Sequence, residues 1–182
     1  LPPDRFKLVY SDEAKRLLTY ENPSLLPRAF FVGKTIVVND DDEVFRKLNS
    51  QEFNPAVTAM LEKQLSQQVG QPDSASSVSI TDYKSREIKL KATTSTTSLL
   101  VLSEIYYPAG WKAYVDGAET EVYKTNYILR SIVVPAGSHE VVFKFEPKFY
   151  EIGWTLSNAA WGVSILCILT GLWQTPSIRS RF

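Results

Sequence analysis

Apolar and polar residues alternate along short stretches between residues 87 and 145 of this 182-residue chain. In Glu87–Thr93, the apolar Ile88, Leu90 and Ala92 are separated by charged side chains, and His139–Phe145 repeats the pattern. Successive side chains of a β-strand point to opposite faces, so a period of two indicates a strand buried on one side. Both stretches are therefore predicted to be half-buried strands.

Other strands are predicted from continuous apolar runs and from turn residues. Leu99–Tyr107 is largely apolar, as expected of a central strand, and Tyr127–Val134 is a further strand. Trp111–Val115 and Thr120–Tyr123 flank Asp116-Gly117, a pair that tolerates positive φ and favours a hairpin. No βαβ alternation is apparent. Regularly spaced short strands predict a mainly β fold, an antiparallel β-sandwich or jelly roll with minor α content.

The N-terminal third has a mixed pattern. A helix is predicted from a cap at Asn39 or Asp40 to about Asn49. Ala56–Gln68 is rich in helix-forming residues, but its first part, Val57–Leu61, also fits a strand, and propensity leaves both open. Short strands are predicted at Phe6–Tyr10, Leu17–Glu21, Arg28–Val32 and Thr35–Val38.

A stretch of 22 residues without charge, Ile152–Trp173, lies near the C-terminal end. As a helix it would be about 33 Å long, close to the thickness of a bilayer's hydrocarbon core. Tyr150 and Trp154 lie at one end and Trp173 at the other, as interfacial aromatic residues do. A transmembrane helix is therefore predicted rather than a buried core helix, which is rarely free of charge over such a length.

This span divides the chain into a β-rich domain over 1–149, a transmembrane helix over 150–174 and a short tail over 175–182. Polar residues within the span, such as Asn158, predict that it packs against other membrane helices. Basic residues do not fix its orientation, because two precede it and two follow it: Lys144, Lys148, Arg179 and Arg181. The chain starts at Leu1 without a signal sequence, so we expect it to be the C-terminal part of a longer protein.

Composition excludes several classes of function. Twenty basic and twenty acidic residues give a net charge of zero, which argues against a nucleic-acid partner. The single cysteine, Cys167, allows no internal disulfide, and with one histidine, His139, no His/Cys metal site is expected. No nucleophile–base arrangement, paired carboxylates or phosphate-binding loop is recognisable, so neither a catalytic residue nor a cofactor is predicted.

An aromatic patch with interleaved polar residues carries the one candidate binding site. Flat rings stack on the C–H faces of sugars, and planar polar groups bond their hydroxyls. The alternative is that the same rings fill the sandwich core and that Arg130 forms a structural pair with Glu104 or Asp116. The residues proposed for glycan contact are Tyr107, Trp111, Asp116, Tyr123, Tyr127 and Arg130.

Several long strings resemble the YfhO family of bacterial membrane proteins. They are Asn22-Pro23-Ser24-Leu25-Leu26-Pro27-Arg28-Ala29-Phe30-Phe31-Val32, the stretch from Leu100 to Gly117, Tyr123–Tyr127, Leu129-Arg130, Val134–His139 and Phe145-Glu146-Pro147. One departure is Ala109, which adds a residue before Gly110-Trp111 compared with some members.

The resemblance implies a polytopic membrane protein similar to GT-C glycosyltransferases, which use polyprenyl-phosphate sugars outside the membrane. In that class the catalytic carboxylate lies in an early loop that this chain lacks. The resemblance further implies that Val57–Leu61 is a strand and that the β-rich domain is extracytoplasmic, anchored in the bacterial inner membrane. Its implied partners are upstream membrane helices of the same protein, membrane lipid, and a cell-envelope glycan or lipid-linked sugar.

On this basis, we expect an accessory domain that holds the acceptor or covers the active site. A purely structural or protein-docking domain without glycan contact is the alternative hypothesis.

Overall fold

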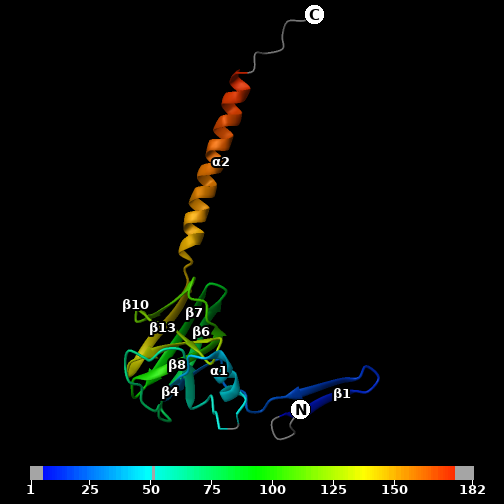
Figure 1. The fold of residues 1–182 in the computed structure, drawn as a ribbon, viewed down its shortest axis with the longest axis vertical. Coiled ribbons are helices and arrows are strands. Elements are labelled where there is room, and N and C mark those ends of the chain that lie inside the picture. The colour runs from blue at the N-terminus through cyan, green and yellow to red at the C-terminus, as the bar shows by residue number, and fades with distance from the viewer. Residues whose placement is uncertain (1–5, 51, 175–182) are drawn as a thin grey trace, which may run out of the picture.

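The computed structural model describes residues 6–50 and 52–174, and it contains two stacked β-sheets from which one long helix and one hairpin project (Figure 1). The predicted tail over 175–182, with Arg179 and Arg181, lies outside the described residues. The prediction of a mainly β, antiparallel fold with a C-terminal apolar helix is confirmed.

The first sheet has five antiparallel strands in the order β10-β9-β13-β7-β6. A two-residue turn at Asp116 (φ +50°) and Gly117 (φ +84°) joins β9 to β10, which confirms the predicted hairpin. The strand bounds are β6 Ser77–Lys84, β7 Glu87–Thr94, β9 Trp111–Val115, β10 Ala118–Thr120 and β13 Gly137–Phe145.

The second sheet has six strands in the order β3-β8-β12-β11-β5-β4. Its strand bounds are β3 Ala29–Val32, β4 Lys34–Val37, β5 Thr58–Leu61, β8 Ser98–Ile105, β11 Tyr123–Thr125 and β12 Leu129–Val134. The predicted strand Thr120–Tyr123 is thus divided between β10 of the first sheet and β11 of the second, so the chain changes sheets there.

The pair β4–β5 is parallel, and helix α1, Asp41–Leu48, connects the two strands. The sequence shows no βαβ alternation, and it did not reveal this crossover. Asp40 caps α1 by accepting a hydrogen bond from the amide of Asp42 at 3.2 Å, and Val44 is the buried residue of the helix. The strand reading of Val57–Leu61 is confirmed by β5, whose Ala59, Met60 and Leu61 side chains are buried.

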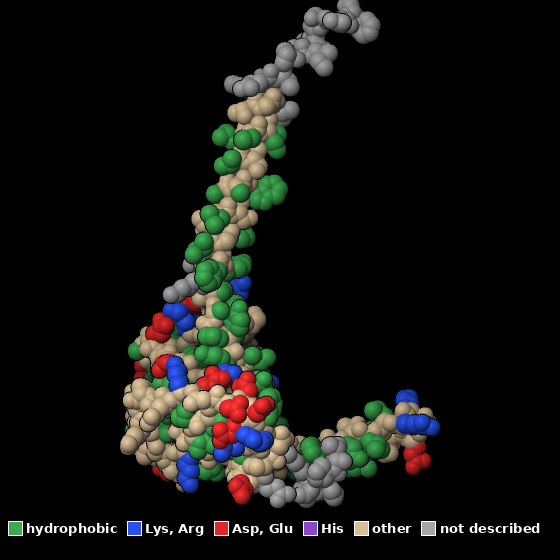
Figure 2. All heavy atoms as spheres, viewed as in Figure 1, with side chains coloured by type: hydrophobic (Ala, Val, Ile, Leu, Met, Phe, Trp, Pro, Cys, Tyr) green, Lys and Arg blue, Asp and Glu red, His purple; other side chains and the backbone are tan. Residues whose placement is uncertain are grey.

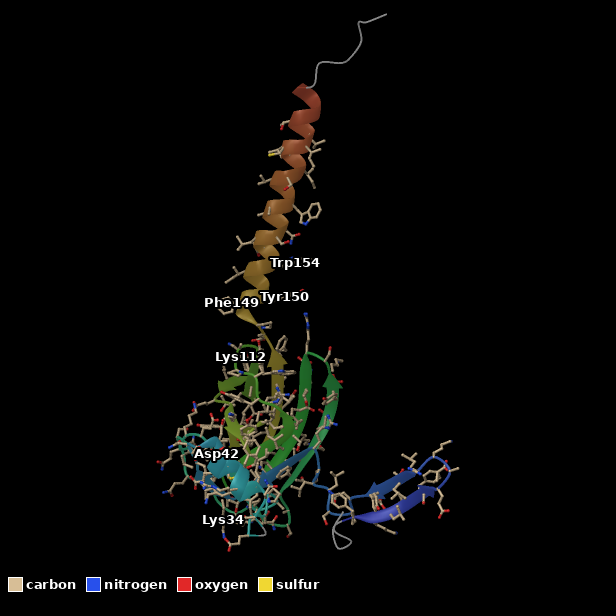
Figure 3. All side chains as sticks on the ribbon, turned by 45° about the vertical axis from the view of Figure 1, so that its right-hand side comes forward. Lys34, Asp42, Lys112, Phe149, Tyr150 and Trp154 are labelled. Atoms are coloured by element: carbon tan, nitrogen blue, oxygen red, sulfur yellow. The ribbon has the colours of Figure 1, made fainter. Side chains whose placement is uncertain are left out.

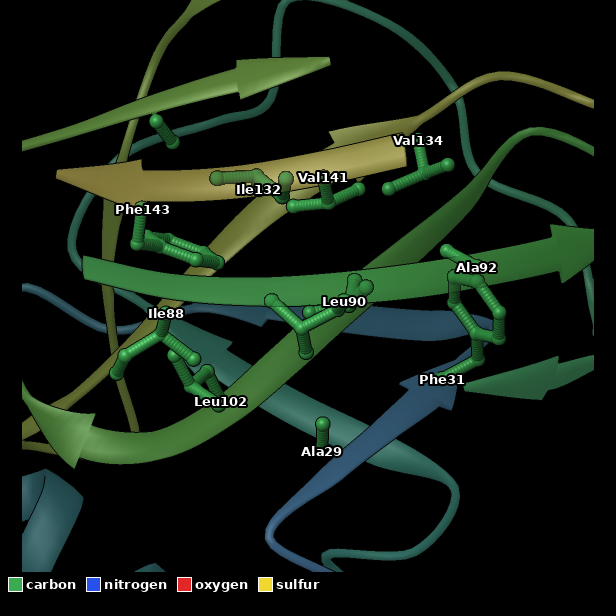
Figure 4. Packing of buried hydrophobic residues seen from close by; sticks show 12 residues of the cluster. Ala29, Phe31, Ile88, Leu90, Ala92, Leu102, Ile132, Val134, Val141 and Phe143 are labelled. Carbon is green, nitrogen blue, oxygen red and sulfur yellow. The ribbon is translucent and has the colours of Figure 1, made fainter. Parts of the chain in front are cut away.

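The main core lies between the sheets (Figure 4). The alternation in β7 buries Ile88, Leu90 and Ala92 completely or nearly so, and Val141 and Phe143 of β13 pack beside them. Burial of an aliphatic or aromatic side chain contributes about 1.5–3 kcal/mol, so this cluster is the chief source of the sandwich's stability.

The hairpin of β1, Lys7–Asp12, and β2, Leu17–Glu21, projects away from the sandwich as a separate two-stranded sheet (Figure 1). Its apolar side chains are exposed on the surface (Figure 2). The most exposed of them are Leu8, Val9, Tyr10, Leu17 and Leu18.

Helix α2, Lys148–Gln174, leaves the opposite side of the sandwich and makes no packed contact along its apolar part (Figures 1 and 2). Its segment Ile152–Gly171 is 20 residues long and apolar enough to cross a membrane, and none of it is buried within the structure. A buried core helix, the alternative interpretation, is therefore excluded for this segment in the described chain.

Candidate functional site

The end of the sandwich from which α2 leaves is here named the helix-proximal end. It comprises the ends of β8 and β13 and the beginnings of β7, β9 and β12, because β8 follows β7 after a chain reversal and pairs antiparallel with β12. The opposite end, with the Asp116 turn, is the helix-distal end.

Three aromatic residues gather at the helix-proximal end. The ring of Phe145 lies 5.5 Å from the ring of Trp111 and 6.3 Å from the ring of Tyr107, measured between centroids. Trp111 is half-buried, whereas Tyr107 is 53% exposed. Of these two residues beside the turn, Tyr107 therefore presents the more accessible ring.

Gly110 allows these rings to approach. A Cβ atom at this position would lie 2.2 Å from Cε2 of Phe145, so no larger residue fits without movement. The carbonyl of Gly110 accepts a hydrogen bond from the amide of Glu146 at 2.6 Å, and the amide of Trp111 donates to the carbonyl of Tyr107 at 3.1 Å. Ala109 is accommodated within this tight turn.

Arg130 lies directly beneath the aromatic group and is 1% exposed. Its guanidinium carbon is 4.1 Å from the centroid of the Trp111 ring and 5.2 Å from that of Phe143, which is a cation–π arrangement. Among the described residues, its Nε and Nη1 atoms have no hydrogen-bond partner. Burial lowers the pKa of this side chain to about 10, still far above neutral pH, so Arg130 is a buried cation.

The pairing predicted for Arg130 does not form. Glu104 instead accepts hydrogen bonds from Nη1 of Arg28 and from the hydroxyl of Tyr83, each at 2.7 Å. The bond to Glu104 raises the pKa of Tyr83. Glu104 is near enough to favour the charged form of Arg130 electrostatically, but no direct ion pair joins them.

Asp116 lies at the helix-distal end, apart from this group. Its carboxylate is 2.6 Å from Nδ1 of His139 and accepts a hydrogen bond from the amide of Glu140 at 2.9 Å. The bond between them raises the pKa of His139 and lowers the pKa of Asp116. Both residues line a groove of about 410 Å³ that Tyr123 also borders.

The remaining two candidates belong to the packing of the second sheet. Tyr123 is 2% exposed, and its hydroxyl lies 3.3 Å from that of Ser66. Tyr127, with φ +76°, packs its ring 4.4 Å from that of Phe45 beside α1. The six predicted residues are therefore spread over three places, and Tyr107, Trp111 and Arg130 are the three that lie together.

A family model matches residues 47–157, about three-fifths of the chain, and describes the bacterial membrane protein YfhO. The chain belongs to the YfhO family of bacterial membrane proteins. This match confirms the resemblance inferred from the sequence. Comparison with curated proteins and with solved structures found no match.

In this YfhO-family chain, the group at the helix-proximal end offers the ring faces of Tyr107, Trp111 and Phe145 and one buried cation, Arg130. Groups of three or more His, Cys, Asp or Glu side chains suited to a metal ion do not occur in the described residues. The arrangement is suited to binding a ligand through stacking and charge, since it presents no nucleophile with an adjacent base.

Sequence reasoning did not assign Tyr83, Phe143 or Phe145 to this group. Tyr83 is in β6, for which no strand was predicted, although Val78 and Ile80 alternate with polar residues there. The two phenylalanines were recognised only as the inner face of a strand. The position of Phe145 beside Trp111 depends on the pairing of β13 with β9, which the sequence does not specify.

Proposed function

We propose that this chain is the extracytoplasmic accessory domain of a polytopic YfhO-family protein that transfers sugars from polyprenyl-phosphate carriers, as GT-C glycosyltransferases do. It is anchored by α2 in the bacterial inner membrane, beside upstream helices of the same protein. Its role is to hold the acceptor glycan near the membrane or to cover the active site, while the catalytic carboxylate lies upstream.

The observation that carries this proposal is the position of the aromatic group. Tyr107, Trp111 and Arg130 lie at the helix-proximal end, and only Glu146 and Pro147 separate β13 from α2. A lipid-linked sugar is confined to the membrane surface, so a contact residue must lie at this end of the sandwich. The exposed ring of Tyr107 is available for stacking on a sugar.

Arg130 has a supporting role in this proposal. Its guanidinium stacks on Trp111 and fixes the orientation of that ring. The two donor atoms without partners also favour an anionic group near the aromatic cluster, because an unpaired buried cation is costly. Phosphate-bearing glycans or carriers provide such a charge.

A matched pair of variants in the full-length protein tests this function. Tyr107→Ala and Tyr10→Ala each remove a tyrosine that is 53% exposed, one at the helix-proximal end and one on the hairpin. Loss of a stacked ring costs about 1–1.5 kcal/mol, so Tyr107→Ala should lower sugar transfer to the envelope polymer about tenfold, with Tyr10→Ala unchanged. Equal transfer by both variants, or unchanged transfer after deletion of residues 1–147, would contradict the proposal.

The hairpin supports a second candidate function, docking of a protein partner. Its apolar side chains are exposed on both faces, and a two-stranded hairpin is at best marginally stable alone in water. A docking domain without glycan contact predicts the opposite outcome of the same pair, in which Tyr10→Ala impairs assembly of the protein and Tyr107→Ala does not.

A further inference from the structure

The joint between the sandwich and α2 is short, and backbone hydrogen bonds connect it both to the sandwich and to the first turn of α2. Two residues, Glu146 and Pro147, connect β13 to α2. The amide of Glu146 donates to the carbonyl of Gly110, and the amide of Tyr150 donates to the carbonyl of Pro147 at 3.0 Å. The helix-proximal end therefore remains close to the first turn of α2.

The position of the apolar segment in α2 sets the depth of this end relative to a bilayer. Four residues, 148–151, precede the segment Ile152–Gly171, and they add about 6 Å at 1.5 Å per residue. Headgroups occupy roughly 5–7 Å on each side of the hydrocarbon core. When the apolar segment spans the core, the helix-proximal end meets the headgroup layer.

Apolar residues are exposed at this end although the sandwich buries such residues elsewhere. Ile105 is 69% exposed, Tyr107 53% and Ile128 50%. Ile105, the last residue of β8, pairs with Leu129, and the carbonyl of Ile128 accepts a hydrogen bond from the amide of Tyr106. Ile105 and Ile128 therefore lie close together. Phe149 and Tyr150 lie at the start of α2, next to the sandwich, and are exposed as well (Figure 3).

Two cations at the same end lack an acidic partner among the described residues. The guanidinium of Arg86 lies 5.4 Å from the Tyr150 ring, and the ammonium of Lys144 lies 5.7 Å from the Tyr114 ring. In contrast, Lys84 and Lys112 form ion pairs with Asp82 and Glu119.

Two carboxylates close to Lys144, along the chain and across the β13–β7 pair, are engaged with other partners. Glu87 forms an ion pair with Lys89 at 3.4 Å, and Glu146 accepts a hydrogen bond from the Tyr114 hydroxyl at 2.9 Å. Within the described residues, neither Arg86 nor Lys144 would have to break an ion pair in order to bind an external anion.

We propose that the helix-proximal end rests on the membrane and binds anionic phospholipid headgroups through Arg86 and Lys144, with Ile105 and Ile128 in the interfacial layer. The short joint to α2, whose apolar segment is long enough to span a bilayer, identifies the membrane as the occupant of this surface. The inference concerns how the domain is held and is independent of any sugar transfer.

Site-directed spin labelling of the 182-residue chain in lipid nanodiscs tests this docking. In a Cys167→Ser background, one label is placed at Ile128→Cys and a reference label at Lys34→Cys, which lies far from α2 (Figure 3). In nanodiscs containing phosphatidylglycerol, the label at 128 should be accessible to oxygen and protected from a water-soluble nickel chelate. The label at 34 should show the reverse.

Charge variants identify the headgroup contact. Each basic residue near an anionic surface shifts such an equilibrium about fivefold, so Arg86→Gln with Lys144→Gln should lower the ratio of docked to undocked label roughly 30-fold. Lys7→Gln with Lys91→Gln, two exposed lysines elsewhere, is the matched control and should leave the ratio unchanged. Arg86→Lys, which keeps the charge, should also dock.

Three results would overturn the proposal. One is equal accessibility of the two labels to the nickel chelate. Another is an equal effect of the two double variants, with circular dichroism showing that both are folded. The third is equal docking in phosphatidylcholine alone, which would exclude anionic headgroups as the ligand. None of these measurements involves a sugar, so a failure of membrane docking is distinguishable from a failure of the proposed function, which is tested by sugar transfer.

Discussion

The sandwich and the β1–β2 hairpin use similar residues with opposite results. Leu90, Leu100 and Phe143 are 0% exposed in the sandwich, whereas Leu8, Tyr10 and Leu18 of the hairpin are 49–53% exposed. Both regions are antiparallel, but the hairpin has no second sheet to cover it. The difference shows that strand pairing alone buries little apolar surface, and that the sandwich owes its stability to packing between sheets.

The largest effect is expected from removing a large apolar side chain in each region. Phe143→Ala should lower the free energy of unfolding by about 3–5 kcal/mol, because it leaves a cavity between the sheets. Leu18→Ala in the hairpin should change it by less than about 0.5 kcal/mol. Urea unfolding in detergent micelles, followed by near-ultraviolet circular dichroism, measures both. Similar losses would mean that the hairpin is packed against the sandwich.

A glycine pair extends the comparison to the sandwich and α2. Gly110→Ala should cost about 1–3 kcal/mol, because its Cβ atom would overlap the Phe145 ring. Gly162→Ala is the control, since no atom lies within 4 Å of its added Cβ atom. The same unfolding assay applies. A loss below 0.5 kcal/mol for Gly110→Ala would show that the Phe145 ring moves away at little cost.

Arg130 is the polar exception within the packed sandwich. Arg130→Met keeps the approximate length of the side chain but removes a buried charge, two of whose donor atoms, Nε and Nη1, lack a hydrogen-bond partner. Stability should rise by about 1 kcal/mol, measured by the midpoint and slope of urea unfolding. A decrease of that size would instead mean that stacking on Trp111 and Phe143 outweighs the cost of burying the charge.

The smallest effect is expected at the exposed helix-distal turn. The raised pKa of His139 gives stability that is present at low pH and lost as pH rises through that pKa. The lowered pKa of Asp116 gives stability that is lost as pH falls below the ordinary range of an aspartate.

The pair should therefore stabilise the fold most in mildly acidic solution. The excess melting temperature of the native chain over His139→Gln should be largest between about pH 4 and 6.5 and should shrink at pH 9. An excess that grows with pH would contradict this pairing.

The fold class followed from local patterns because β7 and β13 alternate regularly and face a single core. Two elements did not follow. In β6, a register shift between Ile80 and Asp82 interrupts the alternation, and this bulge weakens the period-two pattern. The parallel pair β4–β5 depends on a crossover through α1, and its strands have only four residues each, too few to reveal their partners.

The candidate site was less predictable than the fold. The residue types at Tyr107, Trp111 and Arg130 suggested binding, but their common position arises from pairing of distant strands. Asp116 was grouped with them because it is near in sequence, yet β9 carries it to the other end of the sandwich. Successive residues along a strand are about 3.3 Å apart. Five residues of a strand are therefore enough to reach from one end of a small sheet to the other.

The strand that continues into α2 has consequences for mechanical load. β13 is flanked on both sides, by β7 and by β9, and its hydrogen bonds run across the strand direction. A pull transmitted through α2 acts along β13, so the bonds to both neighbours are sheared together instead of opening one by one. The anchor point of this YfhO-family domain is thus a central strand and not an edge strand, which would be easier to extract.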